Sequence, residues 1–179
     1  MEHDSDADQK RGFSFESKNL LNMEMGINEY TAYDVVNNLD KEYLAKIIKF
    51  LGDEKDGKII ANKIDKHRLQ KPIQTSKELS SIINSVKKNY KTYKKNPSTK
   101  TFQAIRIFVN QELTQLIEGL IEATKLLPHG GILVVVSFHS LEDRIVKNFF
   151  KLYSNLKRNP SRYFPITENK STLFNLILN

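Results

Sequence analysis

Residues 100–150 constrain the fold most, because they combine helix, turn and strand patterns in a fixed order. Apolar residues recur at spacings of three and four as far as Leu127, which predicts one long amphipathic helix. Residues 128–131 (PHGG) predict a stop and a tight turn, since proline cannot continue a helix and glycine accepts a reversed backbone. The apolar run 132–136 is typical of a strand buried on both faces of a parallel sheet. This order predicts an α/β fold.

Polar residues follow this predicted strand. In an open α/β sheet, ligands bind outside the carboxyl ends of the strands, so we expect chemistry in the loop with Ser137 and His139. The pattern Ser140-Leu-Glu-Asp143 predicts a capping box that opens the next helix. An isolated histidine is also common as a structural hydrogen-bonding group, and this interpretation of His139 stays open.

Composition excludes several classes of protein. The chain has 179 residues, 39% hydrophobic and 27% charged, which suits a soluble globular fold of one domain or pieces of two. No apolar run approaches the roughly 20 residues that span a bilayer, and the acidic N-terminus lacks a secretory signal. There is no cysteine, and the four histidines show no metal-ligand spacing. We therefore expect a cytoplasmic protein without a metal site.

Short amphipathic helices without a strand pattern are predicted between residues 31 and 88. Asp40 is expected to cap the first, which Gly52 ends. Thr75 and Glu78 predict a capping box for the third. Each helix is predicted to have one apolar face. The residues are Leu44, Ile47, Ile48 and Leu51 in the first helix, Ile59, Ile60 and Ile64 in the second, and Leu79, Ile82, Ile83 and Val86 in the third. Such a series predicts a helical subdomain.

A basic segment follows these helices. Residues 87–100 contain six lysines, two tyrosines and no acid. Lysines neutralise phosphates and tyrosines stack on unpaired bases, which favours single-stranded RNA. A net charge of +7 also favours a polyanionic partner. A solvated linker remains the alternative. The candidate RNA-binding residues are Lys87, Lys88, Tyr90, Lys91, Tyr93, Lys94, Lys95 and Lys100.

Several blocks of the sequence resemble the ribosomal RNA small subunit methyltransferase H family. They are residues 11–15 (RGFSF), 21–25 (LNMEM), 101–107 (TFQAIRI), 109–113 (VNQEL), 128–131 (PHGG) and 137–147 (SFHSLEDRIVK). The last run is long and unusual. The resemblance implies methylation of the exocyclic N4 of a cytidine in 16S ribosomal RNA of the small ribosomal subunit, with S-adenosylmethionine as cofactor.

The resemblance also implies an architecture. We expect a partial Rossmann-like class I methyltransferase sheet with an inserted all-helical, substrate-binding subdomain. Residues 1–30 would be a remnant of the catalytic domain, 31–96 the helical RNA-binding subdomain, and 97–179 the back half of the Rossmann-like domain. Residues 171–178 are a further candidate strand, and residues 157–163 a basic loop before it.

Roles for individual residues follow from the resemblance. Ser137, His139 and Ser140 would line a pocket for a flipped base. Arg106 would contact RNA or the loop at the strand end. Supporting structural roles are expected for Arg11, Asn110, Glu112, Glu142, Asp143 and Arg144, the arginine at 144 pairing with the neighbouring acids or with phosphate.

The glycine-rich cofactor loop of this class has no counterpart in the sequence, since no G-x-G occurs. We therefore expect a fragment that neither binds S-adenosylmethionine nor methylates by itself. Either a separate chain supplies the missing N-terminal half, or the gene is split or decaying, which we favour. The alternative functions are a non-catalytic RNA-binding module and a gene remnant.

Overall fold

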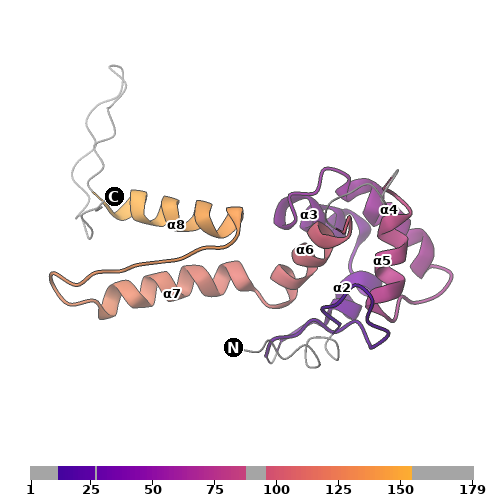
Figure 1. The fold of residues 1–179 in the computed structure, drawn as a ribbon, viewed down its shortest axis with the longest axis horizontal. Coiled ribbons are helices and arrows are strands. Elements are labelled where there is room, and N and C mark those ends of the chain that lie inside the picture. The colour runs from indigo at the N-terminus through magenta and orange to yellow at the C-terminus, as the bar shows by residue number, and fades with distance from the viewer. Residues whose placement is uncertain (1–11, 27, 88–95, 155–179) are drawn as a thin grey trace, which may run out of the picture. The chain divides into compact units, whose positions relative to one another are not determined.

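The computed structural model describes residues 12–26, 28–87 and 96–154 (Figure 1). Regular structure in these residues consists of seven α-helices. They are α2 (Ala32–Asn38), α3 (Lys41–Leu51), α4 (Gly57–Arg68), α5 (Ser76–Asn84), α6 (Thr99–Val109), α7 (Glu112–Leu126) and α8 (Ser140–Tyr153). The chain divides after Glu112 into two compact units, each of which is described by itself.

The first unit is a helical bundle built around α3. This helix packs against both α4 and α6, α4 also contacts α5, and α2 contacts α4 and α6. Apolar side chains at helical spacing meet in one core because each helix has a single apolar face to bury. Fully buried members of this core are Leu21, Val35, Val36, Leu44, Ile48, Ile60, Ile64, Ile73, Leu79, Ile83 and Ile105.

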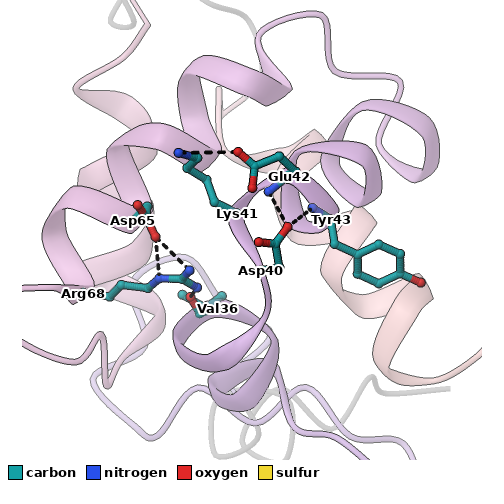
Figure 2. Close-up of polar contacts among 7 residues, drawn as sticks. All are labelled: Val36, Asp40, Lys41, Glu42, Tyr43, Asp65 and Arg68. Atoms are coloured by element: carbon teal, nitrogen blue, oxygen red, sulfur yellow. Dashed lines mark hydrogen bonds and ion pairs between the residues drawn. The ribbon is translucent and has the colours of Figure 1, made fainter.

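Local signals set the ends of these helices, as the sequence predicts. Figure 2 shows the Asp40 carboxylate accepting hydrogen bonds from the backbone N–H groups of Glu42 (2.9 Å) and Tyr43 (3.1 Å) at the start of α3. Gly52 ends α3 and donates its N–H to the Ile48 carbonyl oxygen (3.2 Å). The Thr75 hydroxyl accepts from the Glu78 N–H (3.2 Å) and so caps α5.

Two glycines allow α3 to lie close to its neighbours. A Cβ at Gly52 would collide with the Lys100 carbonyl oxygen at the start of α6. A Cβ at Gly57 would lie 3.0 Å from the Lys49 nitrogen and 3.1 Å from the Ala45 oxygen of α3. Any larger residue at these positions would push the helices apart, because the obstructing atoms belong to the backbone.

Residues 12–26 belong to the same unit as the helices. The Leu21 N–H donates to the Gln74 carbonyl oxygen (2.9 Å), beside an isolated antiparallel bridge between Leu20 and Thr75. The ring of Phe15 packs edge-on against Phe102 of α6, with 4.8 Å between ring centroids. The aromatic residues of the RGFSF block thus serve as packing groups at the edge of the core.

The prediction of one long helix up to Leu127 is wrong. The helix stops at Val109 and restarts at Glu112, and Gln111 between them has a left-handed φ of 49°. Asn110 is 4% exposed and uses its side chain to bind backbone groups of distant residues. These contacts favour the break over a continuous helix.

The second unit contains most of α7, an extended segment and α8. Leu120 and Val146 are its buried apolar residues within the described chain. A turn joins α7 to the extended segment through a hydrogen bond from the Gly131 N–H to the Pro128 carbonyl oxygen (2.9 Å). Near the end of α8, the rings of Phe149 and Tyr153 pack together with 4.9 Å between centroids.

The expected buried strand over residues 132–136, and with it the partial Rossmann-like sheet, stays a prediction that is not seen in the described residues. These contain no strand, and the side chains of Ile132, Val134 and Val136 are 73%, 78% and 72% exposed. A strand requires a neighbouring strand for its backbone hydrogen bonds. None of the described segments supplies one.

Two smaller expectations need correction. His139, and not Ser140, caps α8, and its imidazole accepts from the Leu141 N–H. Ile59 is 57% exposed although it was expected on the buried face of α4, because Ile60 and Ile64 already fill that face.

Some expectations fall outside the described residues. Arg11, the segment 88–95, the basic loop 157–163 and the candidate strand 171–178 are among the residues that the structure does not describe. The division into segments 1–30, 31–96 and 97–179 stays a prediction, because compact units are not by themselves functional domains.

Candidate functional site

Asn110 is the centre of a buried hydrogen-bond network between α6 and α7. Its Oδ1 accepts from the Met25 N–H (2.7 Å) and from Nδ2 of Asn28 (3.0 Å). Its Nδ2 donates to the Met23 carbonyl oxygen (2.8 Å) and to the Arg106 carbonyl oxygen (2.9 Å). The network fastens Met23, Met25 and Asn28 to the end of α6. The supporting structural role expected for Asn110 stays a prediction.

Arg106 and Glu112 bridge the break between α6 and α7. The guanidinium makes two contacts with the carboxylate, Nε to Oε1 at 2.7 Å and Nη2 to Oε2 at 3.0 Å. Such a forked pair fixes both side chains in orientation as well as in distance. Arg106 is therefore engaged within the protein, and its contact with RNA stays a prediction.

Lys87 lies in a buried ionic cluster. Its ammonium group is 2.7 Å from Glu54 and 2.6 Å from Asp56, and its side chain is 11% exposed. Burial lowers the pKa of Lys87, but the hydrogen bonds from Asp56 and Glu54 and their negative charges outweigh it, so the net pKa is raised. Two acids neutralise this lysine within the protein, and its contact with RNA stays a prediction.

Lys100 is the other described lysine of the basic segment. It is half exposed, donates from Nζ to the Asp53 carbonyl oxygen (2.8 Å), and has the Asp53 carboxylate 3.8 Å away. Of the remaining predicted RNA-binding residues, Lys88, Tyr90, Lys91, Tyr93, Lys94 and Lys95 lie outside the described residues. Their role stays a prediction.

The three candidates for a base pocket lie at the start of α8, with Ser137 and His139 in the loop before it and Ser140 as its first residue. Ser137 and His139 are half-buried and Ser140 is exposed. Nδ1 of His139 accepts from the Leu141 N–H (3.3 Å), so the neutral imidazole carries its proton on Nε2 as a hydrogen-bond donor. The structure thus brings the three residues together in one short turn, and their contact with a base stays a prediction.

Charged residues stabilise the first turns of α8. The Glu142 carboxylate accepts from the Phe138 N–H (3.2 Å), which satisfies a backbone donor just before the helix. Asp143 pairs with Lys147 one turn later (2.8 Å). Arg144 is exposed and takes part in no ion pair within the described part of the chain.

The turn at Gly130 and Gly131 does not form a glycine cradle for S-adenosylmethionine. Cofactor sites of this class need glycines that let the backbone approach the ligand. Gly130 and Gly131 are the adjacent glycines of the sequence, and a Cβ at Gly131 would meet the Leu127 side chain at 2.8 Å. The close approach at Gly131 therefore accommodates a leucine within the turn.

A hollow of about 350 Å³ on the first unit is lined by Glu29, Tyr30, Asp34, Asn38 and Leu39. The hydrogen bond to the Thr31 hydroxyl lowers the pKa of Asp34, whose carboxylate caps α2. The hydrogen bond to Glu29 raises the pKa of Tyr30. Both acids are thus engaged locally, and the hollow offers no free carboxylate for a ribose.

Two further searches cover only residues 12–26, 28–87 and 96–154. No group of three or more potential ligands comes close enough to hold a metal ion. None of the helices found there combines the length and apolarity needed to cross a bilayer.

Sequence reasoning missed the partners of Lys87 and a second set of lysines. Glu54 and Asp56 lie more than 30 residues before Lys87, so no local pattern links them. Exposed lysines also recur through α3 and α4 at helical spacing. These lysines recur on the helix sides opposite the apolar faces, and this pattern in the sequence could have predicted a basic surface.

Comparisons with known proteins identify relatives of this chain. A model of the MraW methylase family matches residues 5–178. The ribosomal RNA small subunit methyltransferase H of Sinorhizobium medicae is 44% identical over 165 residues, which cover 92% of this chain and 48% of that protein. The protein of the same name from Sulfurihydrogenibium is 48% identical over 150 residues, which cover 83% of this chain and 51% of that protein. The chain thus spans about half the length of the curated relatives that it matches.

Proposed function

Because the chain belongs to the MraW methylase family, we propose that it forms part of an S-adenosylmethionine-dependent methyltransferase that acts on 16S ribosomal RNA of the small ribosomal subunit. The reaction is methyl transfer to the exocyclic N4 of a cytidine. The observation that carries this proposal is the family match over residues 5–178, which includes the loop before α8. The relatives are named for methylation of small-subunit ribosomal RNA.

Within that enzyme, we assign substrate recognition to this part of the chain. The first unit has a well-packed helical core, and its surface carries many exposed lysines. Ser137, His139 and Ser140 are offered as contacts for the flipped base, with the Nε2–H group of His139 as a donor to a base oxygen. Positioning of this kind is the main contribution that a protein makes to methyl transfer.

Cofactor binding is assigned to residues beyond those that the structure describes. Gly131 packs against the Leu127 side chain, and the acids that line the hollow of the first unit are Glu29 and Asp34, both of which are hydrogen-bonded to neighbouring residues. We therefore propose that this chain by itself binds RNA without methylating it. A complementary chain that carries the N-terminal half of the family is the partner that would restore activity.

The proposal is tested by complementation. The N-terminal portion of the Sulfurihydrogenibium relative, up to the start of the matched region, would be added as a separate chain or fused ahead of this one. Tritiated S-adenosylmethionine and small ribosomal subunits lacking the modification are the substrates, and N4-methylcytidine is detected by mass spectrometry. We expect methylation with both parts together and none with either part alone.

Variants of the fused protein test the roles in the base pocket. His139→Ala should lower kcat/KM for the subunit by about 10-fold or more, the usual effect of losing one positioned polar contact. His139→Asn retains a polar side chain that can cap α8 and is the matched control for folding. Methylation by this chain alone, or a fused protein with no activity although it is folded and binds both ligands, would overturn the proposal.

A further inference from the structure

We propose that the exposed lysines of α3, α4 and the turn between them form a phosphate-binding face for the substrate RNA, an inference that rests on the RNA-binding function proposed above. These residues, called here the α3–α4 lysine face, are Lys46, Lys49, Lys55, Lys58, Lys63 and Lys66. All six are exposed, and neither the relatives' names nor the sequence patterns considered above assign them a role.

The lysines lie on one side of α4. Lys58, Lys63 and Lys66 fall within an arc of about 140° at the 100° step of an α-helix, and Lys55 lies just before the helix. The buried residues Ile60 and Ile64 occupy the opposite side. The basic residues of α4 therefore form a stripe that the core leaves in solvent.

The same arrangement holds on α3, which packs against α4. Lys46 and Lys49 are exposed, whereas Leu44 and Ile48 are fully buried. Gly57 at the start of α4 approaches the backbone of α3 at Lys49, with 3.0 Å from its ideal Cβ to the Lys49 nitrogen. The backbone of α3 at Lys49 thus lies close to Gly57, the residue that precedes Lys58.

The acids of this region do not neutralise the lysine face. Five of these acids pair with cations outside the face: Glu42 with Lys41, Asp53 with Lys100, Glu54 and Asp56 both with Lys87, and Asp65 with Arg68. Asp40 caps α3. None of the six lysines takes part in an ion pair with another residue of the described part. Their positive charge is therefore available to an anion from outside the protein.

The chemistry of the face favours RNA over a lipid surface. Lysine ammonium groups bind phosphates as point charges, and Phe50, which is 63% exposed, offers a ring for base stacking. The Lys49 ammonium lies 5.5 Å from the centre of that ring, so charge and aromatic surface are adjacent. A membrane-surface helix needs a continuous exposed apolar face, and the apolar faces of α3 and α4 are buried in the core.

The test compares two triple variants of the whole chain. Lys46, Lys49 and Lys58 are changed to Gln in one. The control changes Lys71, Lys125 and Lys147 to Gln, three exposed lysines that pair with Glu78, Glu122 and Asp143. Binding to a fluorescein-labelled RNA stem-loop and to phosphatidylserine vesicles is measured over a range of salt concentrations, after circular dichroism has verified folding.

We expect the first variant to bind RNA roughly 10-fold to 100-fold more weakly at about 0.1 M salt, with a salt slope lower by about 2, since each lost single-strand phosphate contact removes about 0.7. The control should change affinity less than about threefold. Changing the same three residues of the face to Arg should preserve binding, because charge is retained.

Three results would overturn the inference. They are an unchanged affinity in the first variant, an equal loss in the control, and stronger binding to vesicles than to RNA. If the unaltered chain does not bind RNA at all, the RNA-binding function fails together with the face. If it binds RNA and the first variant binds equally well, only the lysine face is refuted.

Discussion

At the scale of single residues, Lys87 shows how position changes the role of a charge. In the sequence it begins a run of lysines and tyrosines that is typical of an RNA-binding segment. In the structure its ammonium group lies between Glu54 and Asp56, and Glu54 is 5% exposed. A buried carboxylate without a partner is costly, so this lysine stabilises the first unit.

Replacing Lys87 by Gln should therefore lower the free energy of unfolding by about 2–3 kcal/mol, because Glu54 would stay buried without a cation. The loss should be smaller than for a fully buried pair, since Asp56 is 43% exposed. Urea unfolding followed by circular dichroism measures the change. The surface pair of Lys147 and Asp143 provides the control, and Lys147→Gln should cost less than about 0.5 kcal/mol.

The pH dependence identifies the cause of this effect. The pKa of Lys87 is raised in the folded state, so its stabilising contribution is complete below the unfolded lysine pKa of about 10.4 and is lost as pH rises through the folded pKa. The difference in stability between the natural chain and Lys87→Gln should shrink above about pH 10. A difference that is constant with pH would contradict the ionic explanation.

At the scale of elements, the helix caps explain why the helices of the first unit could be predicted from the sequence. Asp40, Gly52 and Thr75 act through backbone groups no more than four residues away. Patterns of this range are visible in a single sequence, and the helices around them were predicted. Arg68 combines a local contact with a distant one, as Figure 2 shows. It binds Asp65 within α4 and also donates to the carbonyl oxygen of Val36 in α2 (3.0 Å).

Asp40→Ala should destabilise α3 and lower the midpoint of thermal unfolding at neutral pH. Asp40→Asn retains a capping oxygen and should lower the midpoint of thermal unfolding less than Asp40→Ala does. Hydrogen bonds from the backbone of Tyr43 lower the pKa of Asp40, so its contribution is present above the unfolded aspartate pKa of about 3.9 and is lost as pH falls through the folded pKa. The advantage of Asp40 over the Asn variant should disappear on acidification, and a constant advantage would argue against the cap.

Interactions over long sequence distances explain what the sequence did not reveal. The break between α6 and α7 depends on Asn110, whose partners Met23 and Met25 lie more than 80 residues away. A pattern of apolar spacing continues across this break and therefore predicted one helix.

The predicted cap of α8 was one residue too late, because His139 is an uncommon capping residue and Ser140 a common one. Ser137 and His139 lie in the loop before α8 and Ser140 is the first residue of that helix. Their contact with a base remains a prediction.

At the scale of the whole molecule, residues 132–138 are the clearest difference between pattern and structure. A run of β-branched residues predicts a buried strand only if neighbouring strands exist to cover it. In the described chain these side chains are exposed, and Phe138 reaches 94%. Exposed apolar segments of this kind promote association between molecules.

Val134→Lys should therefore lower the free energy of unfolding of this chain by less than about 0.5 kcal/mol, since the Val134 side chain is 78% exposed. The same change should reduce aggregation, which light scattering measures. Leu120→Lys is the contrasting variant: Leu120 is 4% exposed, and the change should destabilise the second unit by several kcal/mol. In the fused protein of the complementation test, Val134→Lys should instead abolish activity, because the family resemblance predicts a buried strand there. Full activity in that variant would refute the strand.

The hydrogen bond from the Met25 N–H to Asn110 spans 85 residues of sequence. At synthesis rates of roughly 5–20 residues per second, a ribosome needs roughly 4–17 s to travel from one partner to the other. Met23, whose carbonyl oxygen accepts from the Asn110 side chain, lacks this partner for that time. The first unit therefore cannot be completed before Asn110 is made, and until then its N-terminal segment is open to chaperones that bind apolar segments.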